Sequence, residues 1–109
     1  MQLPNFSDKF SDNLSLLPAS DAVAAIELVD PSGTPVAKIE NKPGQAGSLR
    51  VYRWLGETFG AITPEAAELG LKIYAEHTLD ARANPGNHPN IDRLLNIKTA
   101  EHTLQVKSL

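Results

Sequence analysis

Two histidines of this sequence lie near carboxylates along the chain, a combination that can carry acid–base or metal chemistry. His77 stands three residues before Asp80, and His88 stands four residues before Asp92. At such spacings imidazole and carboxylate can ligate a divalent metal ion, or the carboxylate can orient the histidine as a general base. The spacing does not match the helix motif that joins two histidines with a catalytic glutamate, so we expect no metal here. A shared site would require these residues and Arg93 to converge on one open cleft.

A structural role explains both histidines more simply. On a helical projection His77 falls near the middle of an apolar face, where we expect a buried side chain that is hydrogen bonded to a neighbouring carboxylate or carbonyl. His88 precedes a proline in a loop and can stabilise the turn. We therefore favour a structural role for the two residues, with ligand binding or acid–base catalysis as the alternative.

A second candidate site is the junction between a predicted strand and a predicted helix. Its loop PGQAGS holds Gly44, Gly47 and Ser48, and Arg50 and Arg53 follow in the first two helical turns. Backbone N–H groups at the start of a helix can point at an anion, and a guanidinium would add charge-assisted hydrogen bonds. The loop departs from the phosphate-binding P-loop because no lysine follows the second glycine. We therefore interpret the glycines as turn residues, with phosphoanion binding as the alternative.

Three large aromatic side chains have no obvious partner within the predicted core. Phe6 and Phe10 belong to a short N-terminal arm, and Trp54 lies at the edge of a helix's apolar face. Burying each is worth about 1.5–3 kcal/mol, and two-fold symmetric dimers are the commonest homo-oligomers. We therefore expect these three residues to hold a second copy or another protein, with docking of the arm on the chain's own body as the alternative.

The residues that must position the histidines form the most regular stretch of the chain. Thr63 can cap a helix with its hydroxyl, and Pro64 is favoured at the first helical position. Apolar and small residues then recur at helical spacing, so we expect one amphipathic helix from Pro64 to Arg82. Gly70 lies inside its apolar face, where glycine costs about 1 kcal/mol relative to alanine, so we expect another backbone to approach closely there.

The remaining elements complete an α+β fold. Alternating apolar and polar residues predict strands in AVAAIELVD, PVAKIEN and HTLQVKSL, and DPSGTP predicts a hairpin turn between the first two. Helices are expected at 48–59, capped by Ser48, and at 91–97, capped by Asn90, with one or two helical turns in SDNLSLLPAS. We expect an arm at residues 1–10 and a single domain at 11–109, whose three-stranded antiparallel sheet is covered by helices 48–59, 64–82 and 91–97.

Composition fits a globular protein. Over 109 residues, 41% are hydrophobic and 21% are charged, and the absence of cysteine excludes disulfides, thiolate metal sites and thiol catalysis. The net charge of −3 is small and the basic residues are scattered, so we expect no nucleic-acid partner. No apolar run approaches the roughly 20 residues of a membrane span, and the N-terminus lacks a signal-peptide pattern. We expect no membrane association and a cytoplasmic location.

Four longer strings of the sequence carry a resemblance: IELVD, IEN.PG.AGSL, GAITPEAAE.GL..YAEHT.DAR and PG.HPNIDRLL. Together they resemble a family of short bacterial proteins of unknown function, and the resemblance covers most of the chain from about residue 11 onward. It implies a proteobacterial, single-domain, intracellular protein. It implies no activity, cofactor or catalytic residue, because the family has none assigned.

The sequence thus predicts a non-enzymatic interaction module that acts through self-association or a protein partner and needs no cofactor. The alternative is a small-molecule or phosphoanion-binding protein, conceivably an enzyme. It would use the junction from Gly44 to Arg53 or the cluster of His77 and His88. A ligand that touches several of these residues would favour the alternative, and a large apolar interface would favour the interaction module.

Overall fold

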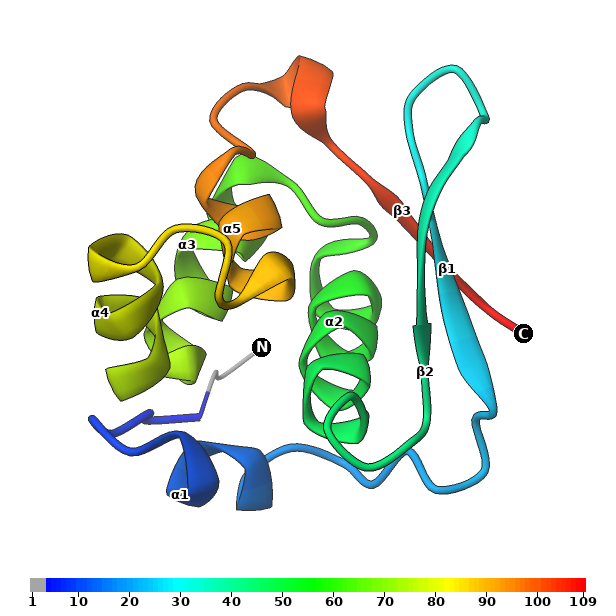
Figure 1. Cartoon of the computed structure of the whole chain (residues 1–109). Helices are drawn as coiled ribbons and strands as arrows, with labels where there is room; N and C mark the ends of the chain where they lie inside the picture. The colour runs from blue at the N-terminus through cyan, green and yellow to red at the C-terminus, as the bar shows by residue number, and fades with distance from the viewer. Residues whose placement is uncertain (1–3) are drawn as a thin grey trace.

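The computed structural model describes residues 4–109, which form five α-helices, one short 3-10 helix and a three-stranded sheet. Helix α2 (Ala46–Phe59) is central: the sheet lies on one side of it, and the other α-helices lie on the opposite side (Figure 1). Leu49, Val51, Tyr52 and Leu55 of α2 are therefore fully buried. The predicted α+β fold is confirmed, and α2 supplies the helix that packs against all three strands.

The sheet consists of the strands β1 (Ala25–Val29), β2 (Pro35–Glu40) and β3 (Gln105–Ser108). Its strand order is β2–β1–β3, and both pairings are antiparallel, as predicted. Ile26 of β1 lies opposite Ile39, and Leu28 lies opposite Val106. Because alternate residues of a strand point to the same face, Ile26 and Leu28 are buried together.

The start of α2 differs from the prediction. The helix begins two residues earlier, after Gln45, and Ser48 does not cap it. Ser48 lies inside the first turn, where its hydroxyl oxygen accepts a hydrogen bond from the phenol of Tyr74 at 2.7 Å. Gly60 ends the helix at a φ of 82°, as predicted, because glycine adopts this left-handed conformation without strain.

The predicted single helix from Pro64 to Arg82 is two helices, α3 (Pro64–Tyr74) and α4 (Glu76–Ala83). Its start is as expected, because the Thr63 hydroxyl accepts a hydrogen bond from the N–H of Ala66 at 3.1 Å. The break is at Ala75, whose φ of 51° and ψ of −114° interrupt the helical ladder of hydrogen bonds. The prediction was wrong there because apolar periodicity runs through the break unchanged.

Side chains outside α3 satisfy the carbonyl groups that the break leaves free. In a continuous helix the carbonyls of Leu71 and Ile73 would accept from residues four positions later. Instead the Thr78 hydroxyl donates to the Leu71 carbonyl at 2.6 Å, and the buried Asn13 amide donates to the Ile73 carbonyl at 2.9 Å. The break therefore leaves neither carbonyl without a partner.

Gly70 marks the close contact on α3 that the sequence predicted, but side chains rather than another backbone approach it. A Cβ atom at Gly70 would lie 2.8 Å from Cδ1 of Leu94 and 2.9 Å from Cδ1 of Leu55. Leu94 belongs to α5 (Pro89–Leu95), which begins before the predicted cap Asn90 and directly after His88. Gly70 therefore lets α2, α3 and α5 meet.

The N-terminal segment packs on the body of the protein. Residues 4–9 have no regular secondary structure, and α1 (Phe10–Ser15) follows; Met1–Leu3 of the predicted arm lie outside the described residues. Phe6 meets Trp54 edge to face with ring centroids 5.7 Å apart, and Phe10 stacks on Tyr74 at 5.0 Å. The expectation that these aromatic side chains lack cover within the chain was wrong, because α1 brings the segment back onto α2 and α3.

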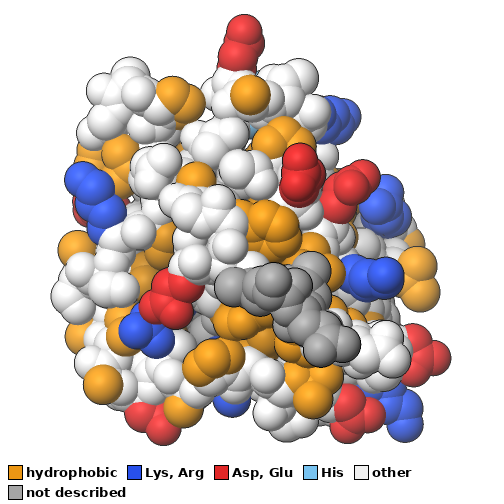
Figure 2. Space-filling model, turned by 180° about the vertical axis from the view of Figure 1, so that it is seen from behind, with side chains coloured by type: hydrophobic (Ala, Val, Ile, Leu, Met, Phe, Trp, Pro, Cys, Tyr) orange, Lys and Arg blue, Asp and Glu red, His pale blue; other side chains and the backbone are white. Residues whose placement is uncertain are grey.

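Charged side chains of both signs mix on one face of the molecule. On the face opposite to the view of Figure 1, Lys and Arg side chains are interspersed with Asp and Glu (Figure 2). Within the described residues, no helix is both long and apolar enough to cross a membrane.

Candidate functional site

Parts of the two candidate sites of the sequence, Gly44 with Ser48 and His77 with His88, meet at a single cleft. Its volume is about 250 Å³, and it opens where the loop before α2 faces the end of α3, the start of α4 and the start of α5. We call it the histidine cleft. Its lining residues are Phe10, Gly44, Ser48, Tyr74, His77, Asn87, His88, Pro89, Asn90 and Ile91.

The two histidine rings of the cleft lie side by side although they come from different elements. Their centroids are 5.8 Å apart and their planes are tilted by 42°. His77 follows the break at Ala75, and its ring lies nearly perpendicular to that of Phe10, with centroids 5.2 Å apart. His77 is only partly buried, which corrects the prediction of a buried core histidine. Thr78 takes the buried position on α4 instead.

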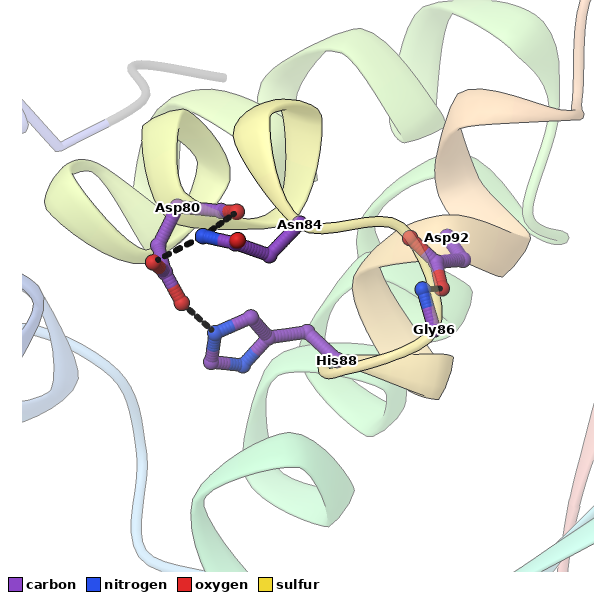
Figure 3. Close-up of polar contacts among 5 residues, drawn as sticks. All are labelled: Asp80, Asn84, Gly86, His88 and Asp92. Carbon is purple, nitrogen blue, oxygen red and sulfur yellow. Dashed lines mark hydrogen bonds and ion pairs between the residues drawn. The ribbon is translucent and has the colours of Figure 1, made fainter.

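The carboxylate partner of His88 is Asp80, and not Asp92 as the spacing suggested. Nε2 of His88 lies 2.5 Å from Oδ2 of Asp80, and the Asn84 amide donates to Oδ1 at 3.0 Å (Figure 3). The hydrogen bond from His88, and after it that from Asn84, lower the pKa of the Asp80 carboxyl. Asp92 accepts a hydrogen bond from the N–H of Gly86 at 2.9 Å and thereby holds the loop before α5 (Figure 3).

This pairing leaves Nδ1 of His88 free of Asp80. In Figure 3 the two ring nitrogens of His88 lie on opposite sides of the ring, with Asp80 at one of them. A carboxylate on one nitrogen fixes the orientation of an imidazole and favours a proton on that nitrogen. The other nitrogen can then accept a proton or a hydrogen bond from a molecule in the cleft. The loop and α4 thus present His88 in a defined orientation.

The wall of the cleft is aromatic, with one hydroxyl pair. Phe10 lies almost parallel to Tyr74, and Tyr74 donates its phenolic hydrogen to Ser48. Burial raises the pKa of Tyr74, so the phenol remains neutral and remains a donor at ordinary pH. The Ser48 oxygen thus accepts one hydrogen bond already, and its own hydrogen can donate to a ligand.

The arginines of the predicted phosphate site are engaged elsewhere. Arg50 donates to the carbonyls of Leu17 and Pro18, which ties α2 to the segment after α1. Arg53 forms an ion pair with Glu57 at 3.2 Å. Both guanidinium groups therefore hold local structure, and neither residue lines the histidine cleft.

Arg93 also lies outside the lining of the cleft. Its guanidinium donates to the side-chain oxygen of Asn90 at 2.7 Å and lies 5.7 Å from the ring centre of Tyr52. Burial raises the pKa of Tyr52 to about 12. Arg93 therefore does not join His77 and His88 in the cleft, since α5 turns it toward α2.

Several residues of the cleft were not predicted as site residues. Tyr74 was assigned only to an apolar helix face, and Asn87 and Asn90 were assigned to a loop and a cap. Gly47, in contrast, was predicted for the site but packs under α1, where a Cβ atom would lie 3.4 Å from Leu14. The sequence offered a signal only for Asn87, which lies in the polar loop beside His88.

The described residues, 4–109, contain no group of three His, Asp or Glu side chains close enough to hold a metal ion. The cluster of His77, His88 and Asp80 is instead a chain of neighbours, in which Asp80 contacts one imidazole and that imidazole faces the other. Such an arrangement can exchange hydrogen bonds and protons with a bound molecule.

The comparison with known protein families gives one result. The model of the family DUF2322, described as an uncharacterized protein conserved in bacteria, matches residues 10–108. No curated protein and no solved structure matches the chain. Because the match covers nearly the whole sequence, the chain belongs to this family.

Proposed function

We propose that this bacterial protein binds a small organic molecule in the histidine cleft. The observation that carries the proposal is the convergence of the loop at Gly44 and Ser48 with His77 and His88, segments about 30 residues apart or more in the sequence, on one hollow. Ligand sites are typically concave, with apolar walls and a few polar groups that orient the ligand. The aromatic wall of Phe10 and Tyr74 and the facing imidazoles fit that description.

The size of the cleft limits the ligand. Its volume of about 250 Å³ falls below the range of about 300–1,000 Å³ that is usual for sites of drug-sized ligands. We therefore expect a small metabolite rather than a nucleotide or a peptide. A cytoplasmic location, where such metabolites are abundant, is part of this proposal and can be measured by cell fractionation.

Self-association is a second proposal. Phe6, Phe10 and Trp54 pack within the chain but are only partly buried, so they stay candidates for the interface. Leu79 of α4, which is 71% exposed, is a further candidate. Burying one such side chain in a dimer is worth about 1.5–3 kcal/mol. Light scattering at high micromolar concentration measures whether a dimer forms, and Leu79→Ser would weaken it.

The test of ligand binding is an NMR screen of neutral and charged fragments against the ¹⁵N-labelled protein. We expect hits whose shift changes concentrate on residues 44–48, 74–77 and 87–91. Asn87→Trp places a large side chain at the exposed rim of the cleft and should abolish these shifts. Asn96→Trp, at the other end of α5, is the matched control and should leave them unchanged. A screen without hits in the cleft would refute the proposal.

A further inference from the structure

We infer that the ligand of the histidine cleft is a small monocarboxylate whose acid group lies against His77 and His88. The inference rests on the proposed binding function and adds the chemical class of the ligand. Its basis is the charge and hydrogen-bonding capacity of the side chains that face the cleft.

The histidines are the cleft's only lining residues that can carry a positive charge, and the lining contains no carboxylate. Asp80 stands behind His88 and not in the lining, and its charge offsets that of one protonated imidazole. With both rings protonated, the cluster of His77, His88 and Asp80 carries a single positive charge. One carboxylate neutralises that charge.

Other titratable groups around the two rings are already engaged. Glu76 of α4 accepts a hydrogen bond from the N–H of Phe10 at 2.7 Å, and this contact lowers the pKa of its carboxyl. Asp92 of α5 is bound to the N–H of Gly86, and the phenol of Tyr74 on α3 stays neutral. Lys9, before α1, lies close enough to Glu76 to interact with its charge. The opposite charges of Glu76 and Lys9 offset one another, so these neighbours leave the net charge around the imidazole pair unchanged.

The hydrogen-bonding groups of the cleft also suit a carboxylate. A carboxylate only accepts hydrogen bonds. Ser48 has its own hydroxyl hydrogen to donate, because its oxygen already receives the phenolic hydrogen of Tyr74. Protonated imidazoles donate from both nitrogens, so Nδ1 of His88 would be a donor while Nε2 stays with Asp80. Residues of α2, of α4 and of the loop before α5 that can donate hydrogen bonds therefore line one cleft.

A phosphate ester fits this lining less well than a carboxylate does. It carries about 1.5–2 negative charges near pH 7 and is bound most strongly by guanidinium groups. Arg50 and Arg53 are held by contacts on other sides of α2, and Arg93 is turned toward Tyr52. Phe10 and Tyr74, by comparison, line the cleft and offer apolar contact to the body of the ligand. A carboxylate attached to a ring or a short apolar chain satisfies both parts of the cleft.

The experiment compares benzoate with benzamide, its uncharged analogue of the same shape, by NMR titration of the intact protein. We expect benzoate to shift the residues of the cleft and to bind at least about tenfold more tightly near pH 6 than near pH 8, because a protonated imidazole attracts a carboxylate and a neutral one does not. Benzamide should bind more weakly and without pH dependence. Phenyl phosphate should bind no more tightly than benzoate.

Variants assign the effect to the cleft. His77→Gln and His88→Gln should each reduce benzoate affinity at pH 6 by about tenfold or more and flatten its pH dependence. The third histidine, His102, is exposed in the 3-10 helix Ala100–His102, so His102→Gln is the control and should change neither. Thermal melts establish that each variant is folded, and the comparison of benzoate with benzamide on the unmodified protein does not depend on them.

Two results would overturn the inference. Equal binding of benzamide and benzoate at both pH values would show a cleft that holds neutral molecules, which removes the carboxylate and leaves the proposed function standing. The absence of any benzoate-induced shift in the cleft would also overturn the inference of a carboxylate ligand. The proposed binding function itself fails only if the fragment screen finds no cleft ligand of any charge.

Discussion

Asp80 and His88 are joined by a contact of 2.5 Å between Oδ2 and Nε2, across the turn that connects α4 to α5. The pair orients the imidazole beside the cleft and also ties two helices together. Because Asp80 lies at the surface, solvent screens the interaction, and its effect is best seen as a dependence on pH.

Asp80→Asn should lower the free energy of unfolding at pH 7, and the difference from the parent should vanish in acid. The native pKa of Asp80 is lowered by His88, so the carboxylate stabilises the fold above its unfolded pKa of about 3.9. That contribution is lost as pH falls through the lower native value. Urea unfolding at pH 7, 4 and 2.5 measures it. Asp21→Asn, at an exposed turn before β1, is the control, and an equal loss in that variant would contradict the prediction.

Ala75→Gly should stabilise the protein by up to about 2.5 kcal/mol. Alanine at φ 51° and ψ −114° is strained by about 1–3 kcal/mol, and glycine relieves that strain at an entropic cost of about 0.4–1 kcal/mol. Ala83→Gly, at the exposed end of α4, should instead lose up to about 1 kcal/mol. Urea unfolding measures the change in the free energy of unfolding for each variant. A lower free energy of unfolding in both variants would show that Ala75 is unstrained.

Gly70→Leu should cost about 1–3 kcal/mol, because the added side chain must displace Leu55 and Leu94. Gly70→Ala should cost less, since both contacts are with the ends of flexible side chains. Glu68→Leu, on the exposed face of the same helix, is the control and should be close to neutral. Chemical denaturation measures all three, and a neutral Gly70→Leu would mean that α2, α3 and α5 are not closely packed there.

Asn13→Leu should destabilise the protein by about 2 kcal/mol or more. The buried amide bridges the Ile73 carbonyl, at 2.9 Å, to the backbone of Ser7, and each buried polar group left without a partner costs about 1–3 kcal/mol. Hydrogen exchange of α1 and of the end of α3 should accelerate together in this variant. Acceleration in α1 alone would show that Asn13 does not support the break at Ala75.

Trp54→Ala should lower the free energy of unfolding by about 1.5–3 kcal/mol, because Trp54 packs against Phe6 within the chain. Light scattering of the parent and the variant separates this effect from any change in association. If the variant is as stable as the parent but loses a dimer, the contact of Phe6 with Trp54 is dispensable and Trp54 belongs to an interface.

Local patterns in the sequence were sufficient for most of the fold. Alternation along β1 and β2, the left-handed glycine after α2, and Thr63 with Pro64 at the start of α3 each depend on a few adjacent residues, so their physics can be applied before the fold is known. The helix boundaries at Ser48 and Asn90 were misplaced, because cap residues also have tertiary partners. Ser48 receives the Tyr74 phenol, which lies 26 residues away.

The sequence by itself determined the strands, the main helices and the two candidate sites, one at His77 and His88 and one at the loop from Gly44 to Ser48. Only the tertiary structure decided that Ala75 breaks a periodic helix. The side-chain amide that donates a hydrogen bond to the freed carbonyl of Ile73 belongs to Asn13, 60 residues earlier in the sequence. The tertiary structure also decided that His88 pairs with Asp80 and that Ser48 and both histidines share a cleft. The same packing places Arg50, Arg53 and Arg93 outside that cleft. Spacing along one helix reports which residues share a face, whereas these contacts depend on how separate elements pack, and no local pattern contains that information.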